Sequence, residues 1–101
     1  MKKQKLPKWY YDLELTVDAK NNEEVTNYHT KKKCTLTPEE LAMYDLINGT
    51  QMMCESMGGV YSSAAQQPYK GIISPIDIIN KGLQWFREAN PEAHEILFTY
   101  E

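Results

Sequence analysis

The stretch Leu36-Thr37-Pro38-Glu39-Glu40-Leu41 decides how the middle of the chain folds, because it carries the signals of a helix start. The Thr37 hydroxyl can accept a hydrogen bond from the backbone N–H of Glu40, and the Glu40 carboxylate can reach back to the N–H of Thr37, as in a capping box. Pro38 falls at the first helical position, where its missing N–H costs nothing. Leu36 and Leu41 occupy the positions of a hydrophobic staple. The stretch predicts a helix over about 38–57.

The residues after this start keep a helical period. One stripe of the helix should carry Met43, Ile47, Thr50, Cys54 and Met57. Gly58-Gly59 should end the helix, because glycine adopts the left-handed conformation without a steric penalty. Gly49 weakens the helix interior, and we expect it to mark the close approach of another backbone.

The last third of the chain repeats the same logic. Ser74-Pro75-Ile76-Asp77 predicts a second helix, with Ser74 as the cap, that runs to about residue 89. Asn90-Pro91-Glu92 predicts a third, short helix with Asn90 as its cap. The β-branched and aromatic residues near the C-terminus favour a short strand from Phe98. Residues 58–73 show no clear period, which is typical of a mobile or functional loop.

The first third of the chain predicts strands. Apolar residues alternate with polar ones over Tyr10–Asp18, which is the pattern of a strand with one buried face. Glu24–Lys33 is rich in Thr, Val and Tyr and predicts a second strand. We therefore expect an α+β fold: an N-terminal antiparallel β-hairpin packed against two main helices and a short C-terminal helix. Residues 1–8 should form a basic N-terminal arm, and residues 9–101 a single α+β domain.

Composition and charge narrow the classes of function. The 101 residues are 42% hydrophobic and 25% charged, as in one soluble globular domain. The net charge of −3 argues against a protein that draws its affinity from nucleic-acid phosphates. Residues 1–35 carry eight basic and five acidic groups, whereas residues 36–101 carry three and nine. This polarity suits head-to-tail self-association or a charged partner, although two solvated faces would also explain it.

Targeting and metal signals are weak in this sequence. Charges interrupt the residues after the basic start, so we expect no secretory signal, and no stretch is apolar enough for a membrane span. Cys34 and Cys54 lack the partners of a zinc site. We expect two reduced thiols in a cytosolic setting, no metal and no cofactor.

Aromatic residues are the main candidates for a binding surface. Trp85 and Phe86 are neighbours on a helix and cannot face one direction, so Trp85 should lie at the margin of the buried stripe, next to Arg87. Large rings in such positions suit an interface, but they could also enclose a thin core. The predicted interface residues are Trp9, Tyr10, Tyr61, Tyr69, Trp85, Arg87 and Tyr100.

Catalytic and nucleic-acid signals are weaker still. His29 and His94 could in principle form a couple with a cysteine, but no local signature supports one, so we expect no catalytic residues. Lys31, Lys32 and Lys33 could contact phosphates, but strand residues alternate between two faces, so only two of them would share a side. Nucleic-acid binding is therefore the less favoured alternative.

Residues Gly82 to Ala93, with the sequence Gly-Leu-Gln-Trp-Phe-Arg-Glu-Ala-Asn-Pro-Glu-Ala, follow a Leu-Thr-Pro-Glu-Glu helix start that contains Tyr44-Asp45. This combination resembles short uncharacterised proteins of tailed bacteriophages. The resemblance covers the C-terminal two-thirds of the chain and brings no catalytic residues with it. It implies a phage product made in the cytoplasm of the bacterial host, either built into the virion or acting on the host.

These observations predict a small non-enzymatic interaction protein. The expected partners are proteins, either further copies of this chain or a larger phage assembly, with no role for a membrane. One alternative is a host-directed counter-defence binder that sequesters a host protein or a small nucleotide signal, with Lys70 and the 58–73 loop lining a pocket. The other is a nucleic-acid accessory protein.

Overall fold

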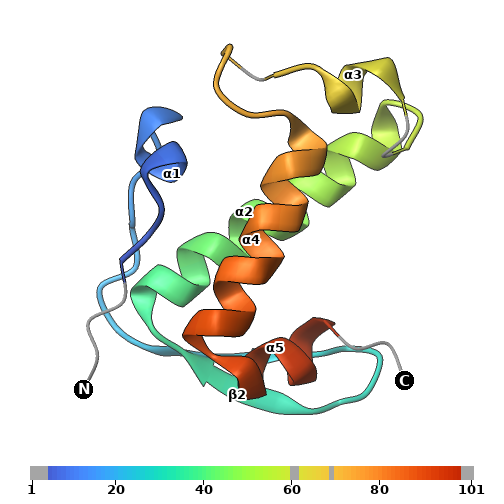
Figure 1. Cartoon of the computed structure of the whole chain (residues 1–101). Coiled ribbons are helices and arrows are strands. Elements are labelled where there is room, and N and C mark those ends of the chain that lie inside the picture. The colour runs from blue at the N-terminus through green and yellow to red at the C-terminus, as the bar shows by residue number, and fades with distance from the viewer. Residues whose placement is uncertain (1–4, 60–61, 69, 99–101) are drawn as a thin grey trace.

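The computed structural model describes residues 5–59, 62–68 and 70–98, and it has the α+β fold that the sequence predicts (Figure 1). A two-stranded antiparallel hairpin lies at one end of a pair of long helices, which shorter helices flank. In chain order the elements are α1 (Lys8–Asp12), β1 (Glu23–Thr26), β2 (Lys33–Leu36), α2 (Pro38–Ser56), α3 (Ser63–Gln66), α4 (Pro75–Ala89) and α5 (Pro91–Phe98).

The start of α2 confirms the capping box. The backbone N–H of Glu40 donates to Oγ1 of Thr37 at 3.3 Å, and Oε1 of Glu40 accepts from the N–H of Thr37 at 2.9 Å. The other end of α2 closes on Gly58, whose φ is +102°, and the N–H of Gly59 donates to the carbonyl of Cys54 at 2.7 Å. This is the 6→1 bond of a Schellman motif, for which the two glycines are suited.

Helices α2 and α4 lie side by side, and their contact holds the centre of the core (Figure 1). Met43, Ile47 and Phe86 have no exposed surface. The residue that lets the two helices approach is Gly82, where a Cβ atom would lie 2.9 Å from Cγ1 of Ile47. The prediction for Gly49 is therefore wrong, because a Cβ atom there would meet nothing within 4 Å.

The two C-terminal helices begin at the predicted caps. The N–H of Asp77 donates to Oγ of Ser74 at 3.3 Å, and the N–H of Ala93 donates to Oδ1 of Asn90 at 3.1 Å. The strand predicted from Phe98 is wrong at that residue, because α5 continues through it. Its ring packs edge-on against Phe86 at a centroid distance of 5.3 Å, and this contact favours the helical turn over an extended end.

The hairpin forms, but its strands are not the predicted ones. Glu23 pairs with Leu36 and Thr26 with Lys33, so the strand predicted over Glu24–Lys33 is split by a loop at residues 27–32. We call residues 27–32 the hairpin loop. The buried side chain of Asn27 holds it: Nδ2 donates to the carbonyl of Ile96 at 2.8 Å, and Oδ1 accepts from the N–H of His29 at 2.9 Å.

The predicted strand over Tyr10–Asp18 is replaced by the end of α1 and an extended segment. Burial still alternates from Leu13 to Ala19, as the sequence pattern predicts. Within the described residues, however, this segment pairs with no strand, and Glu14 interrupts it with a φ of +63°. Its apolar side chains pack on helices, so the pattern identified a buried face but not a ladder of hydrogen bonds.

Residues 5–22, which include α1, form one segment whose apolar side chains cover the core, and we call it the N-terminal strap. Leu6 and Tyr10 are buried in the main core, and Leu13 in a second apolar cluster. The indole Nε1 of Trp85 donates to the carbonyl of Lys5 at 2.8 Å and fixes the start of the strap on α4. The described part of the predicted basic arm, residues 5–8, is therefore packed against the domain.

Candidate functional site

A cleft of about 440 Å³ opens where the strap passes over α2 and the start of α4. We call it the apolar cleft, because most of its lining side chains are hydrocarbon or thioether groups. They are Leu13 and Leu15 from the strap, Leu46 and Met53 from α2, and Ile78 from α4. The volume falls in the range of pockets that take a small molecule or a large side chain.

Gly49 explains why this space is open. It lies in the lining of the cleft, between the turns of α2 that carry Leu46 and Met53. A Cβ atom on Gly49 would meet no atom within 4 Å, so the missing side chain leaves free volume. Glycine in a helix interior lowers stability by roughly 1 kcal/mol compared with alanine. Gly49 therefore makes the fold less stable at the point where the cleft opens.

An ion pair spans from the strap to the segment before α4. Nζ of Lys70, which lines the apolar cleft, lies 3.5 Å from Oε2 of Glu14. Both residues have a left-handed backbone, with φ of +54° and +63°. That conformation costs an L-residue roughly 1–2 kcal/mol. An exposed ion pair contributes about 0–1 kcal/mol, so it does not by itself explain both backbones.

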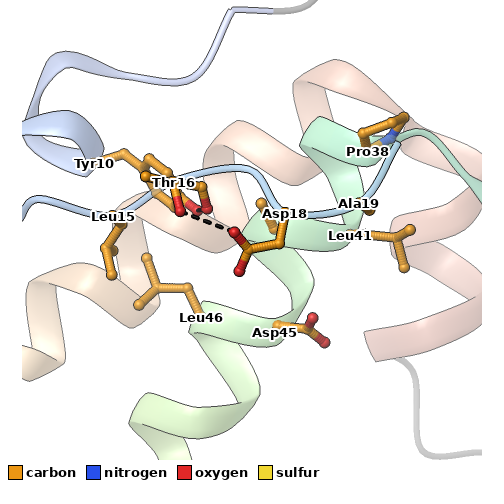
Figure 2. A pocket seen from close by; sticks show the side chains of 10 residues that line it. Tyr10, Leu15, Thr16, Asp18, Ala19, Pro38, Leu41, Asp45 and Leu46 are labelled. Carbon is orange, nitrogen blue, oxygen red and sulfur yellow. Dashed lines mark hydrogen bonds between the residues drawn. The ribbon is translucent and has the colours of Figure 1, made fainter. Parts of the chain in front are cut away.

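A second, smaller cleft of about 270 Å³ adjoins the first (Figure 2). The two share Leu15, Asp45 and Leu46. Figure 2 shows the dashed bond in which Oγ1 of Thr16 donates to Oδ1 of Asp18 at 3.0 Å. The carboxylates of Asp18, from the strap, and Asp45, from α2, both belong to this lining.

Acidic groups give this side of the molecule a negative potential. Desolvation by the surrounding chain, followed by the charge of Glu23, raises the pKa of Asp45 above its ordinary value. Burial raises the pKa of Tyr10, and the neighbouring Tyr11, followed by Asp18 and Asp45, adds to the effect. We call Asp18, Glu23 and Asp45 the acidic rim. Asp18 and Asp45 line the second cleft, and Glu23 lies close enough to Asp45 to act on its charge.

Replacing Asp45 tests the acidic rim. Because the pKa of Asp45 is raised by folding, the folded chain holds its proton over a range of pH in which the unfolded chain has lost it. Stability therefore falls as the pH rises from the ordinary value of Asp to the raised one, and the penalty persists above that. Asp45→Asn should unfold at a higher denaturant concentration than wild type at neutral pH, with a difference that shrinks as the pH is lowered through this range. A constant difference at every pH would contradict the assignment.

The predicted interface residues differ in how far they are exposed in the structure. Trp9 and Trp85 are half-buried and pack on the core, as rings that enclose it would. Tyr10 is 3% exposed and donates its hydroxyl to the carbonyl of Thr16 at 3.0 Å, so its interface role is wrong for the folded chain. Arg87 is exposed and borders a small pocket with His94. Tyr61, Tyr69 and Tyr100 lie outside the described residues.

The most exposed large apolar residues were not predicted as site residues. Tyr28 is 81% exposed in the hairpin loop, and Met52 is 71% exposed on α2. The strand predicted over Glu24–Lys33 includes Tyr28, because tyrosine and its neighbouring threonines favour strands. The signal that could have identified it is Asn27, since asparagine often begins a turn by accepting hydrogen bonds from the backbone N–H groups that follow it.

The cysteines and histidines lie in separate places. Cys54 is buried with Ala65 and Ile79, whereas Cys34 is half-buried in a groove beside Glu92. Burial first, and then the charges of Glu40 and Glu92, raise the pKa of the Cys34 thiol, which keeps it protonated and a weaker nucleophile. His94 lines a different pocket from Cys34, and burial followed by the charge of Arg87 lowers its pKa.

Lys31, Lys32 and Lys33 are all exposed, but they are not three residues of one strand. The first two lie in the hairpin loop, where Lys31 has a φ of +66°, and only Lys33 belongs to β2. Nζ of Lys33 lies 3.8 Å from Oε1 of Glu24 across the hairpin. The prediction that strand alternation separates the three is therefore wrong, and the loop gathers Lys31 and Lys32 at its end.

Neither a metal site nor a membrane-spanning helix is found among the described residues. Within residues 5–59, 62–68 and 70–98, no three His, Cys, Asp or Glu side chains converge as metal ligands would. Among the helices that the structure describes, none combines the length and the apolar character of a membrane span. Comparisons of the chain with protein-family profiles, with curated proteins and with solved structures found no match. The similarity to bacteriophage proteins therefore stays a prediction from the sequence.

Proposed function

We propose that this protein acts by binding, without catalysis, and that it captures an apolar side chain or short segment of a protein partner in the apolar cleft. The observation that carries the proposal is the cleft itself, about 440 Å³ in volume and lined mainly by Leu, Ile and Met side chains. Such a surface gains free energy by excluding water from hydrocarbon, which favours recognition. Methionine suits it, because its flexible thioether adapts to different shapes.

The chemistry around the cleft supports binding rather than turnover. Its polar lining consists of Asp45, Thr50 and Lys70, and Lys70 already has Glu14 as a partner. Neither a thiol nor an imidazole lines the cleft among the described residues. A general acid–base pair works best with a group that titrates near neutral pH and lies within hydrogen-bond reach of the substrate. The cleft offers shape and hydrocarbon surface instead.

An aromatic sulfonate tests the cleft directly. We expect 1-anilinonaphthalene-8-sulfonate to bind saturably and to shift the methyl NMR signals of Leu13, Leu46, Met53 and Ile78. Gly49→Trp should abolish these shifts, because the indole would occupy the free volume beside Gly49. Tyr28→Ala is the matched control and should bind as wild type does at a concentration at which wild type is monomeric, since Tyr28 is not among the residues that line the cleft. Shifts that avoid the cleft methyls, or that survive Gly49→Trp, would refute the proposal.

A second candidate function has one specific observation in its favour. Lys70, from the 58–73 segment, lines the cleft, as the hypothesis of a nucleotide-sequestering counter-defence protein requires. A single lysine that is already paired is a modest match for a phosphate-rich ligand. Thermal unfolding with cyclic nucleotides distinguishes the two: a rise in melting temperature that Lys70→Ala removes would favour the nucleotide, and no rise would favour the protein partner.

The bacteriophage setting belongs to the same proposal and rests on the resemblance of the sequence. If the protein is part of a particle, mass spectrometry of purified virions should find it in a fixed copy number. Its absence from particles would favour a role in the host cytoplasm instead.

A further inference from the structure

The exposed Tyr28 and the apolar cleft are two unexplained surfaces of opposite shape on one chain. Tyr28 is the most exposed large apolar residue that the structure describes, at 81%, and it projects from the hairpin loop. Tyrosine side chains are enriched in interfaces and in their binding hot spots. The cleft is the complementary feature, because its volume exceeds what one aromatic side chain needs.

The hairpin loop is held in shape before any contact. The buried Asn27 donates to the carbonyl of Ile96 and accepts from the N–H groups of His29 and Thr30. The N–H of Lys31 also donates to the carbonyl of Asn27 at 2.7 Å. A loop fixed in this way loses little conformational entropy on binding, which favours its use as a binding element.

The charges of the two surfaces are also complementary. The hairpin loop that carries Tyr28 also carries Lys31 and Lys32, and all three side chains are exposed. The acidic rim borders the clefts with Asp45 and Asp18, and Glu23 acts on Asp45. Opposite potentials on facing surfaces steer association and fix its register.

The loop and the cleft of one molecule cannot meet. Asn27 fixes the loop to the C-terminal half of α5, whereas the cleft lies under the strap, beside the start of α4. Figure 1 places the hairpin loop and α1 at opposite ends of the molecule. If the loop of this chain enters a cleft of this chain, the two must belong to different copies.

We infer that the partner captured by the apolar cleft is a second copy of this chain, which inserts Tyr28 of its hairpin loop and sets Lys31 and Lys32 against the acidic rim. The inference rests on the proposed function and names its partner. The contact is heterologous, because the two copies contribute different surfaces. Each added copy brings a new loop and a new cleft, so the assembly grows into a ring or a filament.

Paired variants test this inference by size-exclusion chromatography with light scattering. Wild type should form species heavier than a monomer, in proportions that rise with protein concentration. Tyr28→Ala lacks the inserted ring and Gly49→Trp has a filled cleft, so each should remain monomeric alone. Mixed together, they retain one working loop and one working cleft between them and should form a species of two chains that grows no further. Tyr11→Ala, which removes another exposed tyrosine, is the control and should associate as wild type does.

The charge contribution has its own exchange experiment. Asp45→Lys should weaken association at least tenfold, and Lys31→Glu with Lys32→Glu in a separate variant should do the same. Combining all three substitutions in one chain should restore association, because every loop and every cleft then again carry opposite charges.

Each remaining outcome is decisive. A wild type that stays monomeric at the highest soluble concentration overturns the inference, as does a Tyr28→Ala variant that still associates, or a mixture that grows beyond two chains. If Gly49→Trp fails to fold, Asp45→Lys replaces it as the variant with the impaired cleft. Failure here is separable from failure of the proposed function, because binding of the sulfonate to the cleft of the monomer does not require Tyr28.

Discussion

Phe86→Ala is expected to lower the free energy of unfolding by about 3–5 kcal/mol, the usual cost of removing a buried aromatic ring from a core. Phe86 has no exposed surface and contacts the rings of Phe98, Tyr44 and Trp85, at centroid distances of 5.3, 6.5 and 6.5 Å. A domain of this size has a total stability of roughly 5–15 kcal/mol, so the variant should be largely or partly unfolded at ambient temperature. Urea unfolding followed by circular dichroism measures the loss.

Tyr28→Ala is the matched control for this change, since it removes an aromatic ring that is 81% exposed. Its stability should differ from that of wild type by less than about 0.5 kcal/mol, as is usual for surface substitutions. This should be measured at a concentration at which wild type is monomeric. A loss for Phe86→Ala no larger than that for Tyr28→Ala would contradict the position of the core.

Gly82→Leu is expected to lower the free energy of unfolding by about 3 kcal/mol, at the upper end of the cost of overpacking. The first added carbon would lie 2.9 Å from Cγ1 of Ile47 and 3.2 Å from the sulfur of Met43. Ile47 is β-branched and fully buried, so it cannot move aside without displacing other core residues. Helices α2 and α4 would have to separate. Thermal and urea unfolding both measure the effect.

Gly49→Ala is the control, because it replaces the glycine of the partner helix where nothing lies within 4 Å. It should raise the free energy of unfolding by up to about 1 kcal/mol, through the better helix propensity of alanine. The two helical glycines should therefore respond with opposite signs. Equal effects at Gly49 and Gly82 would show that the helices do not meet at Gly82.

The helices were predictable because their signals are local. Thr37, Ser74 and Asn90 each cap a helix by accepting a hydrogen bond from the backbone N–H three positions later. Such contacts can be predicted because both partners are close together in the sequence. The C-terminal end of α2 was predictable for the same reason, because it depends on Gly58, which comes directly after the C-cap residue. What the sequence did not disclose is which helical glycine meets a partner, since Gly49 and Gly82 look alike until the helices are placed together.

The sequence predicted that a β-hairpin forms, but it did not predict which residues form its two strands. Alternation over the strap records that one side is buried, and burial does alternate there, but the covering surface is made of helices rather than a neighbouring strand. Most of the first strand, Glu23–Thr26, lies within the predicted strand over Glu24–Lys33, but of the second strand, Lys33–Leu36, the prediction covers only Lys33. The pairing of the two strands depends on the loop that Asn27 organises through Ile96, a residue 69 positions away.

The candidate site was predictable only through Lys70. The apolar cleft arises where residues from the strap, α2 and α4 converge, and none of them carries a motif. The predicted interface relied on aromatic residues, of which Tyr10 is buried in the core, while Trp9 and Trp85 are half-buried against it. Asn27 is a sequence signal for a turn at Tyr28, but the exposure of the ring depends on how the loop is held against Ile96, 69 positions from Asn27.

The long-range hydrogen bonds have a consequence for how the chain folds during synthesis. Lys5 is bonded to Trp85, 80 positions later, and the loop at Asn27 is bonded to Ile96. While the ribosome is still making α2, the first 30 residues have none of these anchors and their apolar side chains remain in water. The N-terminal third must therefore dock after the C-terminal third emerges, and a nascent chain stalled before α4 should be readily digested by proteases over its whole length.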